Sequence, residues 1–378
     1  MQLPKLNLDL PRLELPKLRL KKEDGVVGLT LDASGVAAAE VRMSGGAHLR
    51  AAATAPLPDG AFHDGEVVDP DAVAATLRQL FSAHGLSRQV RLGIANQRVV
   101  VRTMRLPAIE DPDQLATAIR FAAEEQIPMS IDEAVLDHRV VGGVGAVDGE
   151  GPKIDVVVVA ARRDMITASL EPLRKAKLEP VGIDLSAFGL IRALGARPTA
   201  PAIATDAATD VEQAPAAVIY CDFGDNTNLA IARGRACLFA RVAPGGLEDI
   251  AMKLAGTAGM SVEHARMWLA HVGLEQPPES IEGDPGVVAQ TRDALEGGAA
   301  ALRDELRLSA DFYGAQEGSL TIEGVVLTGA GTAIPGLAEW IGRSLGMPVE
   351  VGIPAALSNY DTASAGRLTP SYGLALES

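Results

Sequence analysis

The sequence is poor in aromatic residues: Phe, Trp and Tyr together make up 3% of the chain, whereas apolar residues make up 47%. The hydrophobic cores therefore have to be built from Ala, Val, Leu and Ile, which suits layered packing of helices on sheets. At 378 residues the chain is long enough for more than one domain, each with its own core.

The chain has only two cysteines, Cys221 and Cys237, and they fall in neighbouring strand-like runs. Small buried thiols are the usual role of such residues, and a disulfide is not expected in a reducing compartment. We therefore expect both cysteines to be free and buried.

Long apolar runs are also missing. The longest uninterrupted stretches, such as Val156–Ala161, fall well short of the roughly 18 to 20 residues that a membrane-spanning helix needs. Prolines and charges interrupt the leucines near the N-terminus, which excludes a secretory signal. We expect a cytoplasmic protein.

Positive charge is scarce, since the formal net charge is −15. This balance excludes a nucleic-acid partner held by phosphate contacts. The first 22 residues are the exception, with six basic and two acidic side chains.

Recognisable hydrolase and metal-binding motifs are missing as well. The sequence has no Gly-x-Ser-x-Gly and no His-Glu-x-x-His, and its six histidines show no metal-ligand spacing. Gly331 and Gly336 have the spacing of a P-loop, but Leu337 and Ala338 stand where Lys and Ser/Thr are needed. We predict no catalytic residue and no metal ligand.

What the sequence does contain is a repeated order of elements. Each half shows three strand-like runs followed by helix, strand and helix, which predicts a duplicated α/β fold with two halves around a central cleft. The predicted division is a tail at 1–22, a first half at 23–96 and 162–194, a linker at 195–215 and a second half at 216–378.

Two hairpin-like stretches, 27–40 and 219–230, are similar in pattern. Such turns aim backbone N–H groups at phosphates, and an acid at the turn can hold a hydrated metal. Asp-x-Gly-x-x-Thr is also an ordinary hairpin sequence, and the later glycines also suit a plain strand-to-helix turn. The candidate nucleotide-binding residues are Gly28, Thr30, Asp32, Ser34, Asp222, Gly224, Asn226, Thr227, Gly329, Ala330 and Gly331.

The chain resembles the PilM family, the actin-like cytoplasmic component of type IV pilus assembly, from about residue 26 to 376. The resemblance rests on Gly28-Leu29-Thr30-Leu31-Asp32, on the segment Met104–Val141, on CDFGDNTNLAIA, on LTGAGTAIPGL and on the ending Tyr372-Gly-Leu-Ala. It implies an actin-like, ribonuclease-H-like fold related to that of FtsA, in which residues 97–161 form a small inserted subdomain. It also implies a scaffold that docks the N-terminal tail of a PilN-like inner-membrane protein between the first half and the insert.

Several residues depart from the family pattern. Thr30 replaces an aspartate, Asp32 a glycine and Ala37 a lysine, while the segment 265–269 reads Ala-Arg-Met-Trp-Leu where the family shows Ala-Glu-x-x-Lys. Losing such polar contacts weakens nucleotide binding, since each charged hydrogen bond contributes roughly 1.5 to 3 kcal/mol. We expect a degenerate cleft that binds ATP and Mg weakly or not at all, in a protein that is not an enzyme.

Two other functions stay open at this point. An active actin-like ATPase or filament former resembling FtsA would need Asp32 to replace the missing acid, and a sugar or acetate kinase would need a catalytic acid in the same place. A crystal soak or a thermal-shift titration with ATP and magnesium would best separate these functions from a scaffold.

The N-terminal tail repeats Pro-basic-Leu-x-Leu at 4–8, 11–15 and 16–20, which predicts an extended segment. Leu6, Asn7, Leu8, Leu10 and Pro11 resemble the Ile-Asn-Leu-Leu-Pro tail of PilN with one inserted residue. The tail is therefore either a mimic of the partner peptide, giving self-association, or a basic arm at the inner face of the membrane.

Overall fold

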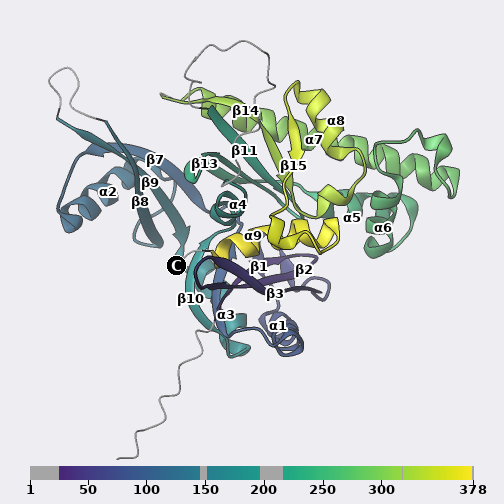
Figure 1. The fold of residues 1–378 in the computed structure, drawn as a ribbon, viewed down its shortest axis with the longest axis horizontal. Coiled ribbons are helices and arrows are strands. Elements are labelled where there is room, and N and C mark those ends of the chain that lie inside the picture. Colours follow the sequence, from purple (N-terminus) through teal and green to yellow (C-terminus); the bar gives the residue numbers. More distant parts are fainter. Residues whose placement is uncertain (1–24, 145–150, 196–215, 317, 377–378) are drawn as a thin grey trace, which may run out of the picture.

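The computed structural model describes residues 25–144, 151–195, 216–316 and 318–376 (Figure 1). Most of the predicted tail and linker lie outside these ranges. Among the described residues, no helix is both long and apolar enough to cross a membrane.

The first half is built on a five-stranded sheet of order β10-β6-β1-β2-β3. β1 (Val26–Asp32), β2 (Gly35–Met43) and β3 (Ala47–Pro56) form an antiparallel meander, and β6 (Gln89–Ile94) and β10 (Glu179–Leu185) continue it in parallel. Helices α1 (Pro70–His84) and α3 (Arg163–Lys175) pack on one face through a common core. A short hairpin of β4 (Phe62–His63) and β5 (Glu66–Val67) precedes α1.

The second half repeats this arrangement in the order β13-β12-β11-β14-β15. The strands are β11 (Ala216–Phe223), β12 (Thr227–Arg233), β13 (Ala236–Ala243), β14 (Thr321–Thr328) and β15 (Val349–Val351). One face is covered by helices α5 (Leu247–Ala258), α6 (Val262–Val272), α7 (Pro285–Gly314) and α8 (Leu337–Leu345). In both sheets the first strand of the half is central, so the predicted duplicated α/β fold is confirmed.

A third, separate sheet lies at the left of Figure 1, and its Val101 and Val157 share a core with the sheet of the second half. It has the order β7-β9-β8, with β7 (Val100–Pro107), β8 (Ala134–Val144) and β9 (Lys153–Arg162). Helix α2 (Pro112–Gln126) covers it and shares with its strands a separate hydrophobic core. These elements coincide closely with the range predicted for the insert.

Two helices lie between the halves in the middle of the molecule (Figure 1). Helix α4 (Ser186–Leu194) packs through Leu190 and Leu194 against the sheet of the second half. Helix α9 (Thr362–Ala375) packs through Leu368 and Tyr372 against β2 of the first half. Helix α4 belongs to the first half in sequence and α9 to the second, so each of them packs on the sheet of the other half.

Helix α9 is absent from the sequence predictions because Pro370, Gly366 and Gly373 interrupt its pattern. The glycines are required by close packing. A Cβ on Gly373 would lie 1.8 Å from the Gly189 carbonyl oxygen of α4, and one on Gly366 would lie 2.2 Å from the Gly329 oxygen. Backbone therefore packs directly on backbone where α9 crosses its neighbours.

The two cysteines are free and buried, as expected. Burial raises the pKa of both thiols, that of Cys237 to about 12. Neither thiol is therefore a reactive nucleophile in the folded protein.

Candidate nucleotide cleft

A small cavity lies where the β1–β2 turn of the first half meets the β11–β12 turn of the second. Its volume is about 50 Å³, which is room for a few water molecules. Its lining consists of Thr30, Leu31, Asp32, Ala95, Ser186, Asp222, Gly224, Asp225, Asn226, Asn228, Ala330, Arg367 and Pro370.

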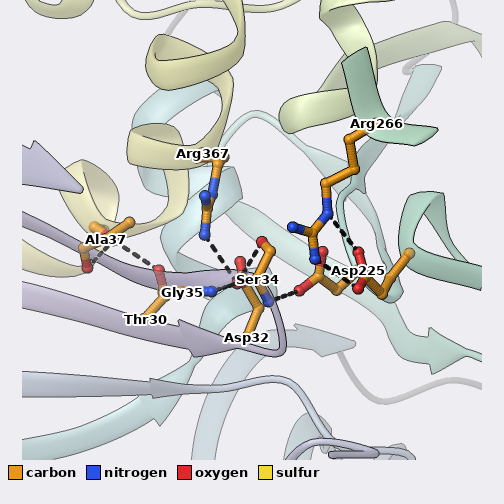
Figure 2. Close-up of polar contacts among 10 residues, drawn as sticks. Thr30, Asp32, Ser34, Gly35, Ala37, Asp225, Arg266 and Arg367 are labelled. Atoms are coloured by element: carbon orange, nitrogen blue, oxygen red, sulfur yellow. Dashed lines mark hydrogen bonds and ion pairs between the residues drawn. The ribbon is translucent and has the colours of Figure 1, made fainter. Parts of the chain in front are cut away.

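The turn of the first half is held by Asp32. Its Oδ1 accepts hydrogen bonds from the Gly35 backbone N–H at 2.7 Å and from the Ser34 hydroxyl at 2.9 Å. The same oxygen accepts from Nη2 of Arg367 at 2.9 Å, which reaches down from α9 (Figure 2). The carboxylate at position 32 is therefore engaged in closing its own turn and in an ion pair.

The turn of the second half contacts the first turn directly. Oδ2 of Asp225 accepts a hydrogen bond from the backbone N–H of Ser34 at 2.5 Å, as Figure 2 shows. Behind this turn, the backbone N–H of Leu247 at the start of α5 donates to the Gly224 carbonyl at 2.7 Å. The Ser34 and Gly35 N–H groups of the first turn are thus bonded within the protein, whereas Asn228 Nδ2 and Arg367 Nε, on residues that also line the cavity, are buried without a hydrogen-bond partner.

Asp222 lies at the end of β11, half-buried in the same cavity. Burial and the neighbouring Asp32 carboxylate raise its pKa to about 7, and Arg367 opposes this only partly. Burial and Asp32 also raise the pKa of Asp225. Three carboxyl groups therefore share the cleft with one guanidinium group.

The later glycines serve the packing of the cleft wall. Gly329 has a φ of +92°, and a Cβ there would lie 2.4 Å from Oδ1 of Asp222. A Cβ on Gly331 would lie 2.3 Å from the ring of Phe223. These glycines let the loop at the start of the 3₁₀ turn (Ala330–Ala333) lie flat against β11.

The predicted site residues fall into two groups. The first group lines the cavity and consists of Thr30, Asp32, Asp222, Gly224, Asn226 and Ala330. Ser34 does not line the cavity, but its backbone N–H donates to Asp225, which does. Gly28 lies beneath α9 against the Ser371 carbonyl, and the hydroxyl of Thr227 donates to the Gly245 carbonyl at 2.8 Å.

Sequence reasoning missed Asp225, Asn228 and Arg367 as cleft residues. The first two flank Thr227 in the quoted motif, so their proximity to the predicted residues was a usable signal. Arg367 comes from α9, far along the chain, and no local pattern marks it.

The altered segment, residues 265–269, lies within α6 and brings Arg266 into electrostatic contact with Asp225. Arg266 donates to Glu248 through Nε at 2.9 Å and Nη2 at 2.6 Å, a two-point ion pair between α6 and α5. This pair engages the two side chains with each other. In this arrangement the cavity between the two turns, at about 50 Å³, is smaller than a nucleotide.

The duplicated sheets, the two crossed helices and the cleft between facing hairpin turns define an actin-like protein. In agreement, the chain is similar in fold to MreB5 of Spiroplasma citri bound to ADP, with a TM-score of 0.51, 12% identity and coverage of 92% of this chain and 94% of that one. It is also similar to the ethanolamine utilization protein EutJ from Carboxydothermus hydrogenoformans, with a TM-score of 0.50, 14% identity and coverage of 93% and 88%.

A stronger similarity identifies the family. The chain matches a structure described as the PilM-PilN type IV pilus biogenesis complex with a TM-score of 0.75 and 26% identity, over 94% of this chain and 98% of that chain. The family model described as type IV pilus assembly protein PilM matches residues 28–369. The chain belongs to the PilM family of type IV pilus assembly proteins.

Proposed function

We propose that this protein is an actin-like scaffold of a type IV pilus or related assembly machine. It docks the cytoplasmic N-terminal tail of a PilN-like single-pass membrane protein and so works at the inner face of the cytoplasmic membrane. The observation that carries the proposal is the 26% identity, over nearly the full length of both chains, to a PilM from a PilM-PilN complex.

The docking surface that we propose is the outer edge of β10. Among the described residues, β10 is paired with β6 on one side and with no strand on the other. Its Val181 is 46% exposed and its Ile183 37% exposed. Leu185, at its end, packs against a cluster that contains Val101 and Val157 of the inserted sheet, so this edge lies beside the insert.

An unpaired strand edge is a template for an extended peptide, because backbone hydrogen bonds give affinity and alternate side chains give specificity. A leucine- and asparagine-containing tail suits this edge, since its apolar side chains would cover Val181 and Ile183. The proposed occupant is therefore an extended apolar segment of the membrane partner.

Replacing both Val181 and Ile183 with aspartate is expected to weaken binding of the partner-tail peptide by about 100-fold, because each charge would have to be desolvated at the interface. Fluorescence anisotropy with a labelled peptide measures the effect. Met252→Asp is the matched control, since Met252 is 45% exposed on α5 of the other half. Equal binding by the double variant would contradict the β10 edge, and failure of every variant and the wild type to bind would contradict the PilN-like partner.

We propose further that the protein is not an ATPase. Purified protein is expected to hydrolyse ATP with magnesium no faster than a buffer blank, because Oδ1 of Asp32 already accepts hydrogen bonds from Gly35, Ser34 and Arg367. A phosphate-release assay measures this. Turnover that disappears in Asp32→Ala would instead support an active ATPase resembling FtsA.

The N-terminal tail gives a separate expectation. Residues 6–11 could compete with the partner peptide for the β10 edge, since a tethered segment has an effective concentration near millimolar. In that case, deleting residues 1–22 is expected to tighten binding of the partner peptide or to abolish self-association. Anisotropy and analytical sedimentation measure the two effects. No change in either would leave the tail as a basic arm.

A further inference from the structure

The carboxylate of Asp225 occupies the β1–β2 turn, where a nucleotide phosphate could otherwise bind. Consecutive backbone N–H groups in a tight turn form a small concavity that binds anions. In the β1–β2 turn these are the N–H groups of Ser34 and Gly35, and both donate to carboxylate oxygens of the protein. The Gly35 N–H is satisfied within its own turn, whereas the Ser34 N–H is satisfied from the opposite half.

Asp225 is fixed in this position from behind. A Cβ on Gly246 would lie 2.2 Å from the Asp225 carbonyl oxygen, so the start of α5 packs tightly against the turn. The Leu247 N–H donates to the Gly224 carbonyl next to it. The second turn is thus held against α5, and its carboxylate projects across the cleft.

The charges around Asp225 also oppose an incoming phosphate. Asp32 and Asp222 face the same cavity, and the guanidinium of Arg367 is already paired with Asp32. Another cation that interacts with Asp225, Arg266, is paired with Glu248. A phosphate would therefore have to displace the Asp225 carboxylate and accept two more acidic neighbours.

We propose that Asp225 is a built-in substitute for a nucleotide phosphate, which occupies the anion-binding turn of the first half and holds the two halves together without a ligand. Removal of the Asp225 side chain would free the Ser34 N–H for an added anion. This inference does not rest on the docking of a membrane partner, since it concerns only the contact between the two turns.

The test is a gain of binding. Asp225→Ala in the full-length chain is expected to bind ADP and inorganic phosphate at least about tenfold more tightly than the wild type by isothermal titration calorimetry. Asp225→Asn keeps an acceptor for the Ser34 N–H but removes the charge, so it is expected to show a smaller gain. Asp293→Ala is the control, because Asp293 is exposed on α7 and does not line the cavity. Unchanged affinity in both Asp225 variants would overturn the proposal.

Amide hydrogen exchange gives a second readout. The Ser34 amide is expected to exchange slowly in the wild type, at least about tenfold faster in Asp225→Ala, and slowly again when phosphate is added to that variant. The proposal that Asp225 replaces a phosphate would be overturned if the Ser34 amide exchanged fast in the wild type. It would also be overturned if phosphate did not protect that amide in Asp225→Ala. Binding of the partner-tail peptide should be the same in the wild type and in all these variants, so failure of the wild type to bind the peptide would count against the proposed function alone.

Discussion

Replacing Gly373 with alanine is expected to destabilise the protein by at least about 3 kcal/mol. The added methyl group would lie 1.8 Å from the Gly189 carbonyl oxygen, so α9 and α4 would have to move apart along their whole contact. Chemical denaturation followed by circular dichroism measures the loss.

The matched control for this change is Gly256→Ala on α5. A Cβ at Gly256 would meet nothing within 4 Å, so the substitution should stabilise the protein by roughly 0.5 to 1 kcal/mol through helix propensity alone. If Gly373→Ala were as stable as the wild type, the direct packing of α9 on α4 would be wrong.

Replacing Asp222 with asparagine is expected to stabilise the protein by about 2 kcal/mol at pH 8. The folded state raises the pKa of Asp222 from 3.8 to about 7, so it binds the proton more tightly than the unfolded state does. The protonated carboxyl therefore favours folding at low pH, and this contribution is lost as the pH rises toward and through 7. Each unit of pKa shift corresponds to about 1.4 kcal/mol, and contact with solvent in the cavity reduces the full value.

Thermal unfolding between pH 5 and 8 tests this expectation. The wild type should lose stability across that window relative to Asp222→Asn, and the difference between the two isolates Asp222 from the other groups in the cleft, Asp32, Asp225, Arg367 and Arg266. Asp293→Asn should show the wild-type profile. A parallel pair of profiles for the wild type and Asp222→Asn would contradict the raised pKa.

The sequence carries most of the fold because strands and helices leave local periodic patterns. The meander at 26–55 and its copy at 217–243 were predictable from alternating apolar runs separated by glycine turns, and the structure has β1–β3 and β11–β13 there. Helix α9 was not predictable, because its glycines and Pro370 lower local helix propensity and are explained only by what packs against them.

The cleft residues were also only partly predictable from the sequence. Asp222, Gly224 and Asn226 could be predicted from one short motif, since a hairpin turn keeps neighbours in sequence close in space. The bond between Ser34 and Asp225 joins residues 191 positions apart, and Arg367 reaches Asp32 across 335 positions. A short motif indicates where a ligand could bind, but only the tertiary structure shows that Asp225 and Arg367 contact the β1–β2 turn.

The crossing of α4 and α9 means that neither half of the chain is a self-sufficient unit. A fragment ending near residue 195 would carry α4 with no second sheet to cover and would leave Ala37, Ala39 and Val41 without α9. Because exposed apolar sheet faces promote aggregation, separately expressed halves should become well folded only when they are present together. We therefore expect the two halves to fold as one cooperative unit. Neither half should be stable when it is expressed alone, but the two fragments should be suitable for split-protein complementation.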